Sequence, residues 1–303
     1  MATMSAWLRV IRVRFLLASV ISVSVAFALS VRYDGTLDLF HAALTLGGVL
    51  ALHASVDLLN DYWDYKRGID TAAGRTRISG GTGVLPEGLL SPQSVYRAGL
   101  LFLALGAAAG AYFVITHGIP IALMLGFAVA AIYFYSTKIV NVGLGEFFVA
   151  VKGCMIVLGS FYIQHGSLEP DAVLAGVAVG SLSSLVLFVA SFPDFEADKA
   201  GGRRTLVIAA GKRRASALFW LFPAVTYGAI IAGAGAGVLP YTALITLAAV
   251  PIVASAGTGL ARHCMSATDQ LLPHLSRALV FGRITGALLV AGIAVSLICP
   301  EWC

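Results

Sequence analysis

The stretch LFHAALTLGGVLALHASVDLLNDYWDYKRGID, residues 39–70, begins as an apolar run and ends in a dense group of acids. Its last 14 residues, from Asp57 to Asp70, hold four aspartates, in a chain that is 59% hydrophobic and 12% charged. The apolar part can cross the hydrocarbon core of a bilayer, which takes about 20 residues as a helix. The stretch therefore predicts a membrane-spanning helix that ends either in a polar site or in a solvated loop.

Similar apolar runs recur along the whole chain, and the mean hydropathy is +0.90. In lipid, only helices and closed barrels satisfy all backbone hydrogen bonds internally. We therefore expect a single all-α polytopic membrane domain over residues 1–303, whose first run is a retained span and not a cleaved signal peptide. Nine spans are expected, near residues 15–31, 39–60, 95–115, 119–136, 143–163, 171–192, 214–234, 239–259 and 278–298.

The basic residues are divided unevenly between the two sides that these spans define. Of the 20 Lys and Arg residues, 17 fall on the side of the N-terminus, two lie inside spans, and Arg32 falls on the other side. Because cytoplasmic loops of membrane proteins are enriched in Lys and Arg, the N-terminus is expected in the cytoplasm. A nucleic-acid partner would need a basic soluble face, which the chain lacks, so none is expected.

A second acidic cluster repeats the first. NDYWD, Asn60–Asp64, ends the second expected span, and DFEAD, Asp194–Asp198, follows the sixth. The two clusters lie 134 residues apart. Each cluster precedes a long loop rich in Gly and Arg, and Pro193 predicts a break in the helix before the second. Four spans separate the clusters, so both are expected at the cytoplasmic surface, as parts of a four-helix internal pseudo-repeat.

The spacing within each cluster favours a bound cation. On a helix, Asn60 and Asp64 lie one turn apart on one face, as do Asp194 and Asp198. Unpaired acids are costly near hydrocarbon, so two such groups that face one cavity predict a bound cation. A small number of oxygen ligands, with coordination positions left open, suits Mg²⁺ that is also bound by a diphosphate. Solvated helix ends are the alternative for either cluster alone. The basic residues available to the phosphates are Lys66, Arg67, Arg75, Arg77, Lys138, Arg203 and Arg204.

Together, NDYWDYKRGID and DFEADKAGGRRTL resemble the two aspartate-rich motifs of the UbiA superfamily of intramembrane prenyltransferases. The resemblance covers most of the chain. It implies a helical bundle around a central cavity that binds Mg²⁺ and an isoprenyl diphosphate, ionises the donor to an allylic cation and alkylates an aromatic or other acceptor. By position, the motif residues that match are Asn60, Asp64, Asp70, Asp194 and Asp198, with Asp61 as a companion; the expected metal ligands are Asn60, Asp61, Asp64, Asp194 and Asp198.

Further motifs resemble one branch of the superfamily. KRGIDT followed by SGGTGVLPEGLLSP, Ser79–Pro92, is similar to the branch that prenylates dihydroxynaphthoate or naphthoquinone precursors in menaquinone biosynthesis. IRVRFLLASV, Ile11–Val20, is similar to that branch's first helix, with Arg14 at a usual basic position. Three positions depart from the family's pattern: Val13 stands where Pro is usual, Asp57 where Asn is common, and SFPD, 191–194, where Asn often precedes the second motif. The alternative acceptors are 4-hydroxybenzoate and glyceryl phosphate.

Other polar and aromatic residues are candidates for contact with the substrates. His53 and Lys152 lie inside spans, where a polar residue is a functional hypothesis by default. Aromatic faces can stabilise a cation, and the candidates are Tyr62, Trp63, Tyr65, Tyr133 and Tyr135. The expected substrate-binding set is Arg14, Lys66, Arg67, Asp70, Arg75, Tyr135, Lys138, Arg203 and Arg204.

Two other classes of membrane protein compete with this interpretation. A secondary transporter has repeats and intramembrane charge, but here the acids cluster at one end of the spans with almost no polar path to the other side. A CDP-alcohol phosphotransferase carries the pattern D-x2-D-G-x2-A-R, which is absent. A prenyltransferase is therefore the preferred hypothesis.

Overall fold

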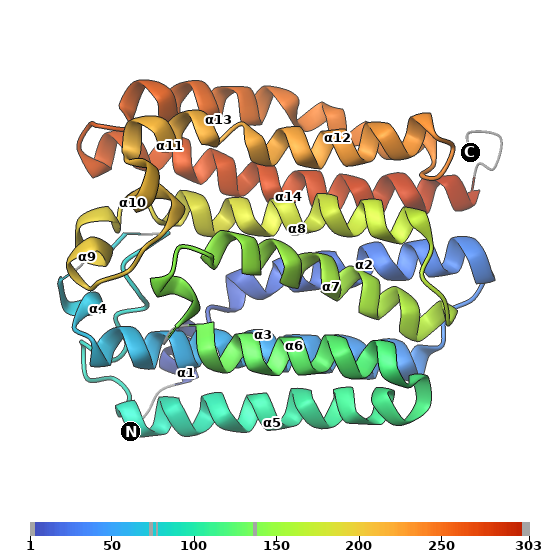
Figure 1. Cartoon of the computed structure of the whole chain (residues 1–303), viewed down its shortest axis with the longest axis horizontal. Coiled ribbons are helices and arrows are strands. Elements are labelled where there is room, and N and C mark those ends of the chain that lie inside the picture. Colours follow the sequence, from blue (N-terminus) through green and yellow to red (C-terminus); the bar gives the residue numbers. More distant parts are fainter. Residues whose placement is uncertain (1–3, 73–74, 77, 136–137, 299–303) are drawn as a thin grey trace.

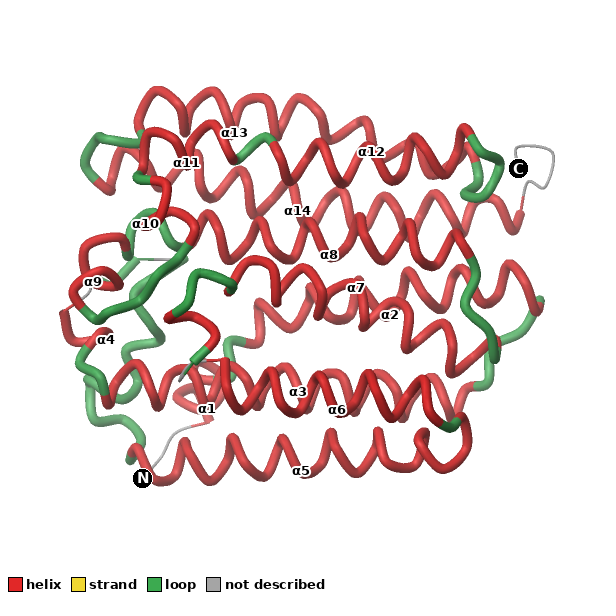
Figure 2. Tube along the Cα trace, viewed as in Figure 1, coloured by secondary structure: helices red, strands yellow, loops and turns green. Residues whose placement is uncertain are grey.

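A computed structural model of the chain describes residues 4–298 apart from 73–74, 77 and 136–137. Over these residues the chain forms helices and connecting loops and no strands (Figure 1, Figure 2). The first half contains α1 (Met4–Val10), α2 (Val13–Asp34), α3 (Leu39–Lys66), α4 (Ile69–Ala72), α5 (Pro92–His117), α6 (Ile119–Tyr135) and the 3₁₀ helix η1 (Ile139–Asn141). The second half contains α7 (Gly145–His165), α8 (Pro170–Ala190), α9 (Phe195–Ala200), α10 (Leu206–Ala210), α11 (Lys212–Leu218), α12 (Leu221–Gly235), the 3₁₀ helix η2 (Tyr241–Ala249), α13 (Val250–His263) and α14 (Thr268–Ile298).

The structure confirms an all-helical membrane fold. Within the described residues, eight segments are long and apolar enough to cross a membrane. Two of them are interrupted helices, since residues 212–235 comprise α11 and α12, and residues 241–263 comprise η2 and α13. The remaining expected span, 119–136, corresponds to α6, an apolar helix of 17 residues that is shorter than the spanning segments. A count of nine full spans therefore stays a prediction.

Local sequence signals account for several helix ends. The Asp38 side chain caps α3 by accepting a hydrogen bond from the backbone N–H of His41 at 2.8 Å. Ser91 caps α5 in the same way, and Pro92 occupies the first helical position. The predicted break before the second cluster is confirmed, because α8 ends at Ala190 and turns precede α9.

The middle of the bundle is held together by the close approach of α7 and α8. Gly153 of α7 faces Gly180 of α8, and a Cβ atom added at Gly180 would collide with the backbone carbonyl oxygen of Ala150. Small residues at such positions let the backbones of membrane helices pack closely. The α8 helix also contacts α12 and α14, so it lies at the centre of the bundle (Figure 1).

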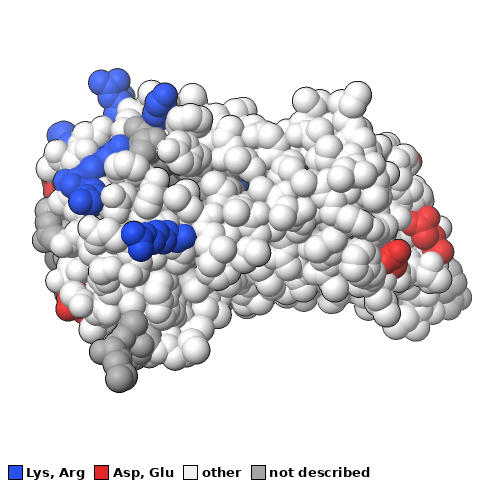
Figure 3. Space-filling model, turned by 90° about the horizontal axis from the view of Figure 1, so that it is seen from below, with Lys and Arg blue, Asp and Glu red and all other residues white. Residues whose placement is uncertain are grey.

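Both acidic clusters lie at one end of the bundle. α3 and α8 each end there and are each followed by a short helix, α4 and α9, and these two short helices contact each other (Figure 1). Figure 3 shows that Lys and Arg side chains gather at this end, while the middle of the visible face is nearly free of charge. α1 also lies at this end, and α14 finishes at the opposite end (Figure 1). This arrangement is the one that the internal repeat predicted.

Candidate active site

A cavity of about 330 Å³ lies among α2, α3, α6, α7, α8 and α14. Its polar end is the end of the bundle that carries both acidic clusters, and much of the remaining wall is apolar. The cavity therefore has a charged end, where the two motifs lie, and a largely apolar remainder. The predicted site residues that line it are Arg14, Asn60, Asp64, Asp70, Tyr135, Asp194, Asp198 and Arg203.

The first motif occupies the last two turns of α3 and the short helix α4. Asn60 and Asp64 lie one turn apart, as predicted, and the Asn60 Nδ2 donates a hydrogen bond to Asp64 Oδ2 at 2.8 Å. Asp70 follows in α4 and is buried, and its Oδ2 has no hydrogen-bond partner among the described residues. Burial and the nearby carboxylates of Asp64 and Asp61 raise the pKa of Asp70 to about 8.

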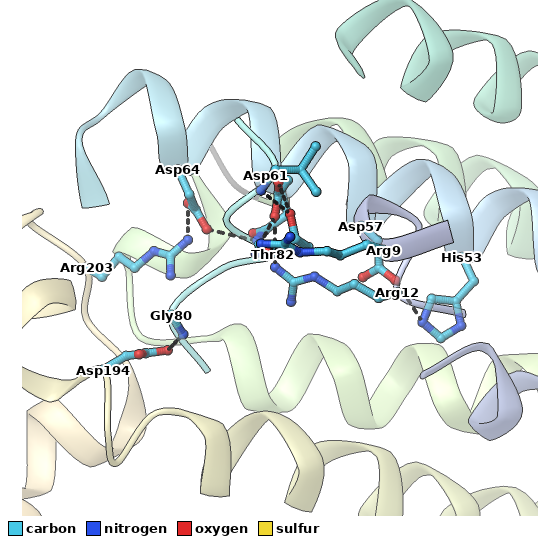
Figure 4. A network of polar contacts seen from close by, with 12 residues as sticks. Arg9, Arg12, His53, Asp57, Asp61, Asp64, Gly80, Thr82, Asp194 and Arg203 are labelled. Atoms are coloured by element: carbon cyan, nitrogen blue, oxygen red, sulfur yellow. Dashed lines mark hydrogen bonds and ion pairs between the residues drawn. The ribbon is translucent and has the colours of Figure 1, made fainter. Parts of the chain in front are cut away.

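The second motif begins in the break after α8. Asp194 precedes α9, and the backbone N–H of Asp198 donates to the Asp194 carbonyl at 2.8 Å, so the two aspartates are one turn apart. One carboxylate oxygen of Asp194 accepts a hydrogen bond from the Gly80 N–H at 3.2 Å (Figure 4), and the other is buried without a partner among the described residues. Burial, together with the Asp198 carboxylate, raises the pKa of Asp194 to about 6.

Arg203 connects the two motifs directly. Its guanidinium forms ion pairs with Asp64 of the first motif and with Asp198 of the second, the latter at 2.9 Å (Figure 4 shows the pair with Asp64). Burial opposes the charge of Arg203, but the two carboxylates outweigh it and raise the pKa of Arg203. Burial also raises the pKa of Asp198, against the lowering effect of Arg203. The carboxylates of the two motifs therefore meet around one positive charge, which the Arg203 guanidinium supplies.

The donor set at this end of the cavity consists of carboxylate and amide oxygens, which suit Mg²⁺. Among the described residues, no three His, Cys, Asp or Glu side chains converge closely enough to form a closed metal cage. Mg²⁺ is usually held by one or two carboxylates together with substrate phosphates, so an open set of this kind fits it. The buried, unpartnered oxygens of Asp70 and Asp194 are further ligands available to a cation.

Asp61 differs from the prediction, because its carboxylate does not line the cavity. Both of its oxygens are occupied by Thr82, whose N–H and hydroxyl donate at 3.2 and 2.7 Å, and Arg12 adds an ion pair at 3.2 Å (Figure 4). Asp61 is fully buried. It therefore fixes the loop around Thr82 and the left-handed Arg12 that precedes α2, and a metal would have to displace these donors.

The other basic candidates lie away from the cavity wall. Arg67 donates to Asn141 at 3.2 Å, and the Arg75 guanidinium pairs with Glu87. Lys66 and Lys138 lie over the rings of Tyr62 and Phe134. Arg204 is exposed, and Arg77 falls outside the described residues. Arg203 is thus the basic loop residue that the fold brings to both motifs.

The deeper wall of the cavity contains a polar group that the motifs do not include. His53 and Lys152 line the cavity, as does Asp57, and the sequence did not single out Ser19, which joins them. Of the aromatic candidates for cation stabilisation, Tyr135 lines the cavity and the other four do not. Phe15 and Phe148 line it without having been predicted, because nothing in an apolar span marks which face is turned inward.

The fold and the cavity define a polytopic helical membrane protein with two aspartate-rich motifs that meet at one end of an intramembrane cavity. The chain belongs to the UbiA prenyltransferase family, whose model matches residues 19–269.

Two groups of relatives are similar to this chain in sequence. A 1,4-dihydroxy-2-naphthoate octaprenyltransferase of Bacillus subtilis (strain 168) is 28% identical over 205 residues, which cover 65% of this chain and 65% of the relative. UbiA prenyltransferase domain-containing protein 1 of Xenopus tropicalis is 29% identical over 64% of this chain and 56% of its own length. The chain thus spans less than two thirds of the length of either relative.

Solved structures share the fold. An apo UbiA homologue from Aeropyrum pernix K1 superposes with a TM-score of 0.69 at 18% identity, covering 94% of this chain and 98% of that one. A UbiA homologue from Archaeoglobus fulgidus bound to GPP and Mg²⁺ gives a TM-score of 0.60 at 17% identity, covering 94% and 99%. These similarities establish the architecture of the bundle.

Proposed function

We propose that this protein transfers an isoprenyl group from a prenyl diphosphate to an aromatic acceptor of the naphthoquinone-precursor type. The observation that carries the proposal is the meeting of Asp64 and Asp198 on Arg203 at the polar end of an apolar cavity. A diphosphate with an isoprenyl chain has the same division into a charged head and an apolar tail. The names of the relatives, 1,4-dihydroxy-2-naphthoate octaprenyltransferase among them, and the GPP and Mg²⁺ bound to a homologue agree with this assignment.

The motif residues hold the diphosphate end of the donor. Asn60, Asp64, Asp194 and Asp198 would ligate Mg²⁺, with Asp70 as an additional buried ligand. A bound divalent cation supplies charge neutralisation for the leaving diphosphate. Arg203 donates to the phosphate oxygens from the loop side once its carboxylate partners turn to the cation, since a guanidinium binds phosphate in a forked geometry.

The rest of the cavity protects the reacting carbon from water. The bond between the allylic carbon and the diphosphate oxygen breaks and diphosphate leaves, while a ring carbon of the acceptor forms the new carbon–carbon bond and releases the proton, or the carboxyl group as CO₂, that it carried. Water would intercept an allylic cation, so an apolar wall favours the ring as nucleophile. Tyr135, beside the motifs, presents an aromatic face to the cation. By the distribution of Lys and Arg, this end of the bundle faces the cytoplasm.

The test is prenyl transfer by purified protein in nanodiscs with Mg²⁺, geranylgeranyl diphosphate and 1,4-dihydroxy-2-naphthoate, with the product detected by mass spectrometry. We expect Asp64→Ala and Asp198→Ala each to abolish transfer while the protein still folds. Glu196→Ala is the matched control, because Glu196 is an exposed acid within the DFEAD stretch that does not line the cavity. Wild-type rates in both aspartate variants would refute the site, and product formation only with 4-hydroxybenzoate would change the acceptor.

A further inference from the structure

A group of polar side chains lies on the cavity wall beyond the two motifs, and the roles assigned above leave it unused. Ser19 comes from α2, His53 and Asp57 from α3, and Lys152 from α7. Asp57 lies seven residues before Asp64, which places it roughly 10 Å deeper along α3 at the rise of an α-helix, on nearly the same face. An isoprenyl chain needs only apolar contacts at this depth, so the group points to a different ligand.

The spacing of these side chains leaves room for one hydroxyl oxygen. Ser19 Oγ lies 2.7 Å from His53 Nδ1, so this ring nitrogen already has a hydrogen-bond partner. The other nitrogen, Nε2, is 3.8 Å from Asp57 Oδ2, too far for a hydrogen bond (Figure 4), and that oxygen is buried without a partner among the described residues. An oxygen placed about 2.8 Å from both atoms would bridge them, accepting from the imidazole and donating to the carboxylate.

Lys152 of α7 adds a basic group to the wall of the same cavity. Its ammonium makes no hydrogen bond and no ion pair within 4 Å with any described residue, although the residue lines the same cavity as Asp57 and His53. Arg12, which precedes α2 and also lines the cavity, is already paired with Asp61. An uncompensated ammonium at this depth in a membrane is costly, so a ligand that brings a negative charge is favoured over a neutral one.

We propose that Ser19, His53, Asp57 and Lys152 form the acceptor subsite and that it selects a hydroxylated aromatic acid. A ring hydroxyl bridges His53 and Asp57, and the acid group lies beside the Lys152 ammonium. The inference rests on the proposed prenyl transfer, because it takes the cavity to hold donor and acceptor together. The protein then recognises the hydroxyl and acid groups of the acceptor, and Lys152 is the residue that selects a negatively charged acceptor over a neutral one.

The experiment measures binding of 1,4-dihydroxy-2-naphthoate and of its neutral amide to the protein in nanodiscs by isothermal titration calorimetry. Wild-type protein should bind the acid at least about tenfold more tightly than the amide, because the charge pair forms out of water. Lys152→Met should abolish this preference by weakening the acid alone. Asp57→Leu should weaken both ligands, since both carry the hydroxyl. Lys212→Met, which removes a charge outside the cavity, should behave as wild type.

Prenyl transfer measured in parallel separates this proposal from the function on which it rests. We expect Lys152→Met to raise the KM for the acid while the KM for the prenyl diphosphate stays unchanged. Binding with the expected preference but no transfer would refute the proposed prenyl transfer and leave the binding of the hydroxylated acid at this subsite standing. Transfer with an unchanged preference in Lys152→Met would overturn the subsite and leave the function standing. Failure of the wild-type protein to bind either ligand would overturn the subsite as well.

Discussion

The replacement Arg203→Met tests whether one guanidinium holds the two motifs together in the absence of metal. Arg203 pairs with Asp64 on α3 and with Asp198 on α9, residues that belong to different halves of the chain. Methionine is similar in length and apolar, so the substitution removes the charge and keeps much of the packing. Two buried carboxylates are then left facing each other without a cation.

The size of the effect follows from the burial of the three side chains. The Arg203 side chain is 11% exposed, and those of Asp64 and Asp198 are 5% and 4% exposed. Removing one partner of a buried ion pair costs about 3–5 kcal/mol, because the other charge is left unpaired. The two pairs share a guanidinium, so we do not add their costs. At about 2–4 °C per kcal/mol, the melting temperature should fall on the order of 10 °C.

The assay is thermal unfolding in nanodiscs, with EDTA and then with excess Mg²⁺. In EDTA the variant should unfold well below wild type, and Mg²⁺ should restore part of the difference, because a ligand that binds only the folded state stabilises it. Arg203→Lys should fall between the two, since an ammonium keeps the charge and loses the forked geometry. Arg204→Met is the control for loss of one exposed positive charge in the same loop.

Equal melting temperatures for Arg203→Met and wild type in EDTA would refute the reasoning, because the two carboxylates would then not depend on the guanidinium. A full loss of stability that Mg²⁺ leaves unchanged would show that Arg203 supports the loop by packing, without acting as a substitute cation.

Two further predictions concern the helix pair and the buried acids. Gly180→Leu should lower the melting temperature, because the new side chain collides with the α7 backbone at a cost of about 1–3 kcal/mol or more. Gly228→Leu is the control and should leave the melting temperature unchanged, because a Cβ added there meets nothing within 4 Å. In EDTA, the free energy of unfolding should fall as pH rises from about 4 to about 8. Burial and the neighbouring carboxylates raise the pKa of Asp70 from 3.8 to about 8. Between these pH values the folded state holds a proton that the unfolded chain has released, so raising the pH favours unfolding. Denaturation curves across this range should show a shallower slope for Asp70→Asn, and an unchanged slope would contradict the assignment.

The helical membrane fold and the placement of both motifs at one end could be predicted from the sequence, because hydropathy and the sidedness of charge act over whole spans. The break at Pro193 was predictable from the ring's missing N–H. The expected span 119–136 also agrees closely with α6, Ile119–Tyr135, although this helix is shorter than the other spanning segments.

The fold brings some of the predicted site residues to the cavity and leaves others away from it, for a geometric reason. Asn60 and Asp64 share a face of α3, whereas Asp61 lies about 100° from Asn60 around the helix and meets Thr82 instead of the cavity. Arg203 and Asp64 are 139 residues apart, and charge alone did not distinguish Arg203 from its neighbour Arg204. Only the fold shows which of two adjacent arginines is turned inward.

The loop that carries Gly80 and Thr82 has a consequence for how the protein is made. Its bond to Asp61 spans 21 residues and can form as soon as the second span has entered the membrane, whereas the bond from Gly80 to Asp194 spans 114 residues. Because chains fold from the N-terminus during synthesis, only the Thr82 end of the loop can be held before the sixth span is in place. A chain that ends before residue 194 would therefore lack the bond that fixes the Gly80 end of this loop, on the wall of the cavity.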